Sequence, residues 1–319
     1  MYKKMKTYIT IFIVLSILLL IGCDALVIEE ENIQATTVCF TDDLGRTVEV
    51  NQPKRVACLI GSFAEMWQLA GGEVCATADD AWDDLGLDLA KDTVNLGNTH
   101  HISAENLLAS SPDFIIASAT GKGNLEMKDT LEASQIPTAY FEVSGFEDYL
   151  RVLKIFTDIT GREDLYEKNG VEVQKQVQTV LEKSKERLQG KEGPRVLLMR
   201  VTATTVYAKS GKDTVLGEML AQLGCVNIAD VDESLLENVS LEHILQMDPE
   251  YIFTVQMGSD TDGTKKHLES LFVEDSAWSK LTAVKENRWY HMEKRLYNLK
   301  PNARWGEAYE GLEEILAEK

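Results

Sequence analysis

One pattern of apolar and polar positions occurs twice along the chain. Apolar residues at helical spacing follow Ser103 and recur after Ser240, an offset of 137 residues, and each set ends before a proline, Pro112 or Pro249. A short apolar run comes directly after each proline. The pattern predicts, in both places, a short helix with serine as its N-cap and then a strand covered on both faces. Because solenoid repeats have shorter periods, a unit repeated once at this distance indicates two lobes of similar build.

Around each copy, short apolar runs alternate with amphipathic segments, which is typical of an α/β lobe. Around the first copy we expect a hairpin at 41–50 turning at Leu44-Gly45, strands at 56–60, 74–78, 93–97, 114–117 and 138–141, and helices at 64–70 and 125–134. Around the second copy we expect strands at 195–200, 205–208, 251–255 and 288–292, a helix at 214–223, and a closing helix with Trp305, Tyr309, Leu312 and Ile315 on its buried face.

The middle of the chain has only helical periodicity. One apolar face runs from Phe146 to Gly161, and from residue 163 to 188 valines and leucines keep helical spacing among many charges. Even broken near Asn169-Gly170, this second segment would span roughly 39 Å at 1.5 Å per residue, enough to cross between lobes. The alternative is a surface helix on a single domain, and the repeat on either side argues against it. We therefore divide the folded chain into an N-terminal lobe at 38–145, a helical connection at 146–190 and a C-terminal lobe at 191–319.

The first residues predict export and a lipid anchor. Three lysines precede an apolar run from Ile9 to Ile21, whose 13 residues are short for a membrane span of ~20 residues. The run ends in Leu20-Ile21-Gly22-Cys23, which resembles a lipobox, so residues 1–22 are expected to be removed and Cys23 to carry lipid. An ordinary export signal with Cys23 incidental is the alternative. The acidic residues 23–37 are expected to form a flexible tether, which would hold the protein at the outer face of the cytoplasmic membrane.

Charge and cysteine content narrow the classes of function. Removing residues 1–22 takes away three lysines and no acid, which lowers the net charge from −20 to −23 and argues against nucleic acid as a partner. No two cysteines form a Cys-x-x-Cys pair, so a zinc or iron–sulfur site is not expected. Cys58 and Cys75 fall in two neighbouring expected strands. A disulfide between them is one possibility in an exported protein, and buried free thiols are the interpretation we favour.

Several short stretches in a fixed order carry a family resemblance. They are Asp42-Asp43-Leu44-Gly45-Arg46, Pro53-Lys54-Arg55-Val56, Leu96-Gly97 before Ser103-x-Glu105, Ser111-Pro112-Asp113, Val239-Ser240-x-Glu242 and Ala283-Val284-Lys285-Glu286-Asn287-Arg288. Together they resemble the binding proteins of ABC importers for ferric siderophores, haem and cobalamin, over most of the mature chain. The resemblance implies an α/β fold of two Rossmann-like lobes joined by one long helix, with a ligand cleft between them. The segment 163–188 is the candidate for that helix.

The resemblance also gives the paired glutamates a role. Glu105 and Glu242 match family positions, one on each lobe, that meet arginines on the two permease subunits. From the residues alone, each would only offset a helix N-terminus, which contributes roughly 0.3–1 kcal/mol. Both effects can hold together. The expected partner is therefore an ABC importer permease, and the binding protein itself is expected to be a monomer.

Candidate ligand contacts follow from the expected strands. Ligands of open α/β sheets bind beyond the carboxyl ends of the strands, so the loops that leave those ends are the places to search. These loops carry Ser62, Phe63, Trp82, His100, Lys122, Arg200, Tyr207, Met257, Arg295, Tyr297, Arg304 and Trp305. Arginine forks and aromatic faces suit an anionic ferric siderophore, with Arg200, Arg295 and Arg304 as leading contacts. The alternatives are that Trp305 belongs to the helix core and that Arg200 pairs with an acid.

Other ligands and other classes of function stay open. Haem or cobalamin ranks second, with an axial donor from His100, His101, Tyr297 or Met257. A bare metal ion ranks third, because only the His100-His101 pair suggests one. No hydrolase, metalloprotease or P-loop motif is present, so we expect no enzyme and no resident cofactor. A lipid-anchored enzyme or a sensory binding protein is the alternative from a different class.

Overall fold

The computed structural model describes residues 37–318 except residues 213, 238 and 276. The expected signal peptide, Cys23 and all but the last residue of the expected tether lie outside the described residues. Residues Thr37–Lys319 form one compact unit, so the boundaries at 145 and 190 stay predictions about its parts. In the described residues no helix is both long and apolar enough to cross a membrane.

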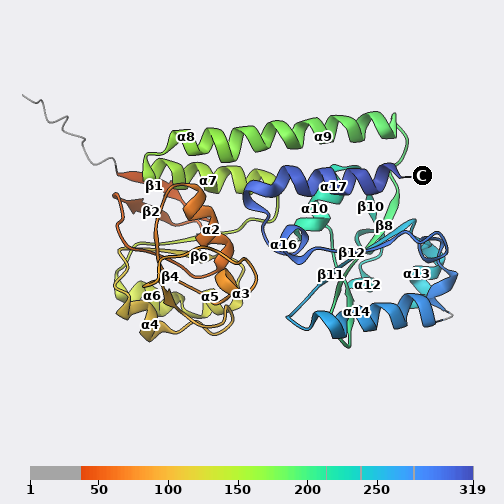
Figure 1. Ribbon diagram of the computed structural model, residues 1–319, viewed down its shortest axis with the longest axis horizontal. Coiled ribbons are helices and arrows are strands. Elements are labelled where there is room, and N and C mark those ends of the chain that lie inside the picture. The colour runs from red at the N-terminus through yellow and green to blue at the C-terminus, as the bar shows by residue number, and fades with distance from the viewer. Residues whose placement is uncertain (1–36, 213, 238, 276, 319) are drawn as a thin grey trace, which may run out of the picture. The chain divides into compact units, whose positions relative to one another are not determined.

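The first lobe is built on a parallel five-stranded sheet (Figure 1). In sheet order its strands are β5 (Val94–Asn95), β4 (Val74–Thr77), β3 (Val56–Cys58), β6 (Phe114–Ser118) and β7 (Thr138–Phe141). Its helices are α2 (Gly61–Leu69), α3 (Asp80–Asp83), α4 (Ala104–Ala109), α5 (Lys122–Glu126) and α6 (Lys128–Ser134). The expected hairpin forms from β1 (Val38–Thr41) and β2 (Thr47–Val50). The predicted helix 125–134 is two helices, and Trp82 lies in α3 instead of a loop.

The second lobe has a sheet of similar build. Parallel strands β10 (Val226–Asn227), β8 (Arg195–Val201), β11 (Tyr251–Gln256) and β12 (Trp289–Met292) lie in that order, and β9 (Val206–Ala208) pairs antiparallel with β8. The helices before β11 are α10 (Val215–Gln222), α11 (Ile228–Val231), α12 (Ser234–Glu237) and α13 (Leu241–Met247). The later ones are α14 (Thr261–Glu269), a π-helical turn (Ser270–Glu274), a 3-10 turn (Trp278–Lys280), α15 (Thr282–Lys285), α16 (Lys294–Tyr297), a 3-10 turn (Asn302–Arg304) and α17 (Trp305–Ala317).

The repeated sequence pattern forms the elements it predicts. Ser103 caps α4 by accepting a hydrogen bond from the Asn106 N–H at 3.2 Å, and Ser240 caps α13 by accepting one from the His243 N–H at 3.5 Å. The strands that follow, β6 and β11, are buried along their whole length. The α/β fold class with two such lobes is therefore confirmed.

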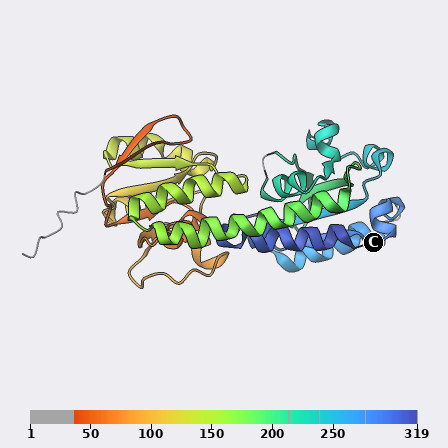
Figure 2. The same cartoon turned by 90° about the horizontal axis from the view of Figure 1, so that it is seen from above.

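The connection between the lobes is a nearly unbroken helix. After α7 (Phe146–Thr160) ends at Gly161, whose φ is 71°, α8 (Glu163–Tyr166) runs through a π-helical turn (Glu167–Val171) into α9 (Glu172–Leu188). The expected break near Asn169 is this π turn. It is held because the Asn169 carbonyl accepts a hydrogen bond from the Tyr149 hydroxyl at 2.7 Å. Seen from above, α8 and α9 cross from the first lobe to the second, with α17 beside α9 (Figure 2).

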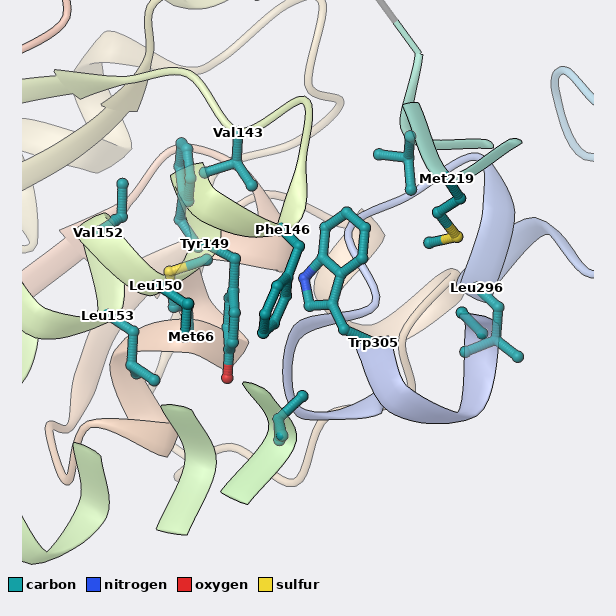
Figure 3. Packing of buried hydrophobic residues seen from close by; sticks show 14 of the residues in the cluster. Met66, Val143, Phe146, Tyr149, Leu150, Val152, Leu153, Met219, Leu296 and Trp305 are labelled. Carbon is teal, nitrogen blue, oxygen red and sulfur yellow. The ribbon is translucent and has the colours of Figure 1, made fainter. Parts of the chain in front are cut away.

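The largest hydrophobic core spans both sheets and the helices above them. At its centre Trp305, the first residue of α17, packs edge-on against Phe146 of α7 with ring centroids 5.8 Å apart (Figure 3). Cys58 and Cys225 are buried free thiols, as expected for Cys58, and Cys75 is free and partly buried. The Cys58–Cys75 disulfide is therefore not formed.

Candidate functional site

A basic segment of the second lobe lies on the first lobe. The segment 293–304 leaves the carboxyl end of β12 and contains α16. The Lys294 ammonium lies 2.6 Å from a carboxylate oxygen of Asp84. Arg295 forms an ion pair with Glu65 on α2, and its guanidinium donates to the Leu85 carbonyl at 2.9 Å. Arg295 is thus engaged in a contact between the lobes in this conformation, and its expected role as a leading ligand contact stays a prediction.

Asn302 closes the same contact. It has a left-handed φ of 54° and is fully buried. Its side-chain amide donates to the Ser62 carbonyl at 3.0 Å and to Glu65 at 2.7 Å. Ser62 is 5% exposed and Phe63 is fully buried, so neither presents a side-chain surface for a ligand in this conformation. Segment 293–304 of the second lobe therefore contacts the carboxyl edge of the first sheet, where we expected an open binding surface.

Three more ligand candidates of the second lobe are buried or hydrogen-bonded to neighbouring residues. Tyr297 is 6% exposed, and its hydroxyl donates to the Ala308 carbonyl at 3.1 Å. Trp305 has no exposed surface, which agrees with its alternative as a core residue. Arg304 donates two parallel hydrogen bonds of 2.7 Å to Glu307, and these bonds raise the pKa of Arg304. In this conformation all three are engaged by neighbouring residues, and their role as ligand contacts stays a prediction.

Arg200 differs from Arg295 and Arg304. It is partly buried near the carboxyl end of β8, and burial lowers the pKa of its guanidinium. Its buried Nε has no hydrogen-bond partner, and in the described part of the chain no carboxylate forms an ion pair with it. A desolvated guanidinium without partners is costly, so this site favours an external acceptor. The alternative that Arg200 pairs with an acid finds no support among these residues.

Strand pairing brings two other predicted residues to Arg200. Tyr207 on β9 is the direct partner of Arg200, so their side chains share one face of the sheet, and Tyr207 is 48% exposed. Met257, 39% exposed, follows β11, and its N–H donates to the Val201 carbonyl at 2.8 Å. Arg200, Tyr207 and Met257 therefore form one surface at the carboxyl edge of the second sheet, which we call the Arg200 surface.

The remaining first-lobe candidates are more exposed. Trp82 is half-buried on α3, and His100 and His101 are exposed in the turn before α4. Lys122 begins α5 with its side chain 84% exposed, 3.7 Å from Glu126. In the residues that the structure describes, no group of three or more His, Cys, Asp or Glu side chains could hold a metal ion.

A pair of aspartates marks equivalent turns in the two lobes. Both carboxylate oxygens of Asp80 accept the Gly61 N–H, at 2.9 and 3.0 Å, and both oxygens of Asp230 accept the Gly211 N–H, each at 3.0 Å. Burial raises the pKa of Asp80 to about 6, and the nearby acids Asp84 and Asp79 add to the effect. This pair is not among the residues predicted from the sequence, although each glycine precedes its aspartate by 19 residues.

Glu105 and Glu242 occupy matching places. Each is the second residue of its helix, α4 or α13, and therefore lies in the first turn. Both side chains are exposed. Neither forms an ion pair within the described residues. Both carboxylates are therefore open to a partner, one on each lobe.

Comparisons with known proteins agree with this architecture. A family model described as periplasmic binding protein matches residues 56–296. The protein YhfQ of Bacillus subtilis (strain 168), assigned as an ABC transporter substrate-binding lipoprotein, is 24% identical over 92% of this chain and 93% of its own length. The structure of Staphylococcus aureus SirA complexed with staphyloferrin B has a TM-score of 0.67 and 22% identity, covering 88% of this chain and 98% of SirA. A periplasmic heme binding protein from Pseudomonas aeruginosa has a TM-score of 0.67 and 18% identity, covering 83% of this chain and 93% of that one.

Proposed function

Because the chain belongs to the periplasmic binding protein family, and is thus a substrate-binding protein of the ABC-transporter type and not an enzyme, we propose that it captures a ferric siderophore. It would deliver this ligand to the permease of an ABC importer from the outer face of the cytoplasmic membrane. SirA, which has the same fold, was crystallised with staphyloferrin B, and this supports the ligand class.

The Arg200 surface is the observation that carries the ligand class. A guanidinium offers a planar fork of donors that matches carboxylate or catecholate oxygens, and Tyr207 offers an aromatic face beside it. Arg295 and Arg304 are already paired with carboxylates, so the arginine contact to an anionic chelate rests on Arg200. Haem is the second candidate, because the exposed Met257 could supply an axial donor to iron and the Pseudomonas aeruginosa heme binding protein shares the fold.

We expect an Arg200→Met variant to bind its ferric siderophore ten- to hundredfold more weakly than wild type. Hydrogen bonds to charged groups contribute about 1.5–3 kcal/mol each, which corresponds to roughly that range of affinity. Tryptophan fluorescence titration against ferric siderophores, haem and cobalamin measures it, with half-buried Trp82 as a reporter in the first lobe.

Arg304→Met is the matched control. Since Arg304 is paired with Glu307, its loss should change the affinity little. Equal losses in both variants would contradict a special role for Arg200. Tight binding of haem or cobalamin with no response to any ferric siderophore would overturn the siderophore proposal and leave the binding-protein assignment standing.

The lipid anchor at Cys23 is also part of the proposal. The match to a lipoprotein over nearly the whole chain supports it. A Cys23→Ala variant should stay unprocessed or be released from membranes, as read by fractionation and by the mass of the mature protein. Cys39→Ala is the control, because Cys39 is an exposed free thiol in the folded part. Processing and membrane retention equal to wild type in Cys23→Ala would show that Cys23 carries no lipid.

Docking to the permease through Glu105 and Glu242 completes the proposal. Both carboxylates are exposed, and each stands on a helix of similar build in a different lobe (Figure 1). Arginines on two related permease subunits would meet one carboxylate each, and such charge-assisted pairs fix orientation as well as contact.

A further inference from the structure

Lys300 belongs to the second lobe but lies over the first. Its ammonium is 5.2 Å from the centre of the Phe63 ring, at the start of α2. Phe63 follows β3, the middle strand of the first sheet. The neighbours of Lys300 hold it there, because Asn302 is bonded to the Ser62 carbonyl and Arg295 to Glu65. The ammonium therefore stands at the carboxyl edge of the first sheet, where open α/β sheets bind ligands.

The other basic side chains of segment 293–304, all of whose residues the structure describes, have carboxylate partners. Lys294 pairs with Asp84, Arg295 with Glu65, and Arg304 with Glu307. The Lys300 ammonium has no carboxylate within 4.0 Å and no hydrogen bond among the described residues. Lys300 thus keeps all three of its donors for another acceptor.

The surroundings of Lys300 are acidic but more distant. Asp80 on α3 and Glu142 after β7 are the charged groups that act on it, and its ammonium lies over the ring of Phe63 on α2. Asp79 and Asp84 act in turn on Asp80. Burial lowers the pKa of Lys300 to about 8, and the two acids offset this only in part. A half-buried cation that lacks a close acceptor is poorly stabilised by the protein alone.

We propose that Lys300 is a ligand contact that donates from the second lobe to an anionic oxygen, carboxylate or catecholate, of the bound chelate. This inference rests on the proposed function and adds a residue that is not among the predicted strand-exit contacts. Together with Arg200 it places one donor at the carboxyl edge of each sheet. The competing explanation is that Lys300 only fastens segment 293–304 to the Phe63 ring.

The pH dependence of binding separates these explanations. With a pKa near 8, the free ammonium is charged at pH 7 and mostly neutral at pH 9, whereas a bound anion keeps it charged. Wild-type affinity should therefore fall roughly tenfold between pH 7 and pH 9 through this group. Asp80, with a pKa of about 6, is ionised throughout that window and adds no change of its own.

The experiment titrates wild type, Lys300→Arg and Lys300→Met with ferric citrate and with a ferric catecholate at pH 7 and pH 9. Lys300→Arg should bind like wild type at pH 7 and lack the tenfold fall, because guanidinium stays charged. Lys300→Met should bind about tenfold or more weakly at pH 7 and also lack the fall. Because wild type and variants are compared at the same pH, protonation of the ligand itself affects all their affinities equally and does not contribute to the difference. Lys175→Met on α9, whose side chain is 68% exposed and is not a ligand candidate, serves as control and should keep both the affinity and the fall.

Each outcome decides the inference. If Lys300→Met keeps wild-type affinity, or if Lys300→Arg shows the same fall as wild type, Lys300 is not a ligand contact. If Lys300→Met fails to fold by circular dichroism, the wild-type and Lys300→Arg comparison still decides. If wild type binds only haemin, the siderophore proposal fails. The same pH comparison with haemin, whose propionates supply the anionic oxygens, then tests Lys300 alone. Binding of cobalamin only would overturn both.

Discussion

A protein in which Glu105 and Glu242 are both alanine should bind its ligand normally and fail to support uptake. The two carboxylates are exposed, and no partner within the described residues engages them in an ion pair. Their loss removes only a favourable charge at each helix N-terminus, about 0.3–1 kcal/mol apiece, because the Ser103 and Ser240 caps remain. Fold and ligand site should therefore survive. Cellular uptake of labelled ligand and titration of the purified variant measure the two effects separately.

Asp129→Ala combined with Asp262→Ala is the matched control for this result. Asp129 lies in the first turn of α6 and Asp262 in the first turn of α14, so the control also removes one helix-terminal charge from each lobe. Uptake should persist in the control. Arginine-to-glutamate exchanges on the permease, paired with Glu105→Arg and Glu242→Arg, should restore transport. Loss of ligand affinity in the purified Glu105/Glu242 variant would instead place these residues in the binding site or in the core.

Signals that act over a few residues were readable from the sequence. The serine caps of α4 and α13, and the buried strands β6 and β11 after them, depend on neighbours within one or two turns. The long helix and its break near Asn169 were also predictable from the sequence. The form of that break, a π turn, was not, because it depends on contacts with Leu69 and Tyr149. The ion pair between Arg304 and Glu307 is also a local interaction, and its spacing of three residues makes it predictable from the sequence.

Contacts between distant residues were beyond the sequence pattern. Arg295 and Glu65 are 230 residues apart, and Lys294 and Asp84 are 210 apart. The sequence indicated that basic residues follow the strands of the second lobe. It carried no signal that the acidic edge of the first lobe would meet them, and so the basic residues were assigned to an anionic ligand. Arg200 has no carboxylate within ion-pairing distance among the described residues, and β9 places Tyr207 beside it.

The sequence predicts two places for Trp305, the buried face of the last helix and a strand-exit loop, since it is the residue where the two meet. The structure decides for burial. Trp305 contacts Phe146 at 5.8 Å, Tyr309 at 6.1 Å and Tyr149 at 6.5 Å between ring centres, and so joins α17 to α7 (Figure 3). No sequence pattern shows that the first residue of α17 will pack against the first turn of α7, because the two helices are far apart in the sequence.

Truncating this side chain should have a large effect on stability. We expect Trp305→Ala to lower the free energy of unfolding by about 3–5 kcal/mol, the range for removing a large aromatic side chain from a packed core. Trp305→Phe should cost much less, because the indole N–H has no hydrogen-bond partner among the described residues and a ring still fills most of the site. Trp82→Ala, at a half-buried position, is the control for loss of a tryptophan. Urea unfolding followed by circular dichroism measures all three. A Trp305→Ala protein as stable as wild type but weak in ligand binding would show that Trp305 faces the ligand after all, and that the core of Figure 3 rearranges when ligand binds.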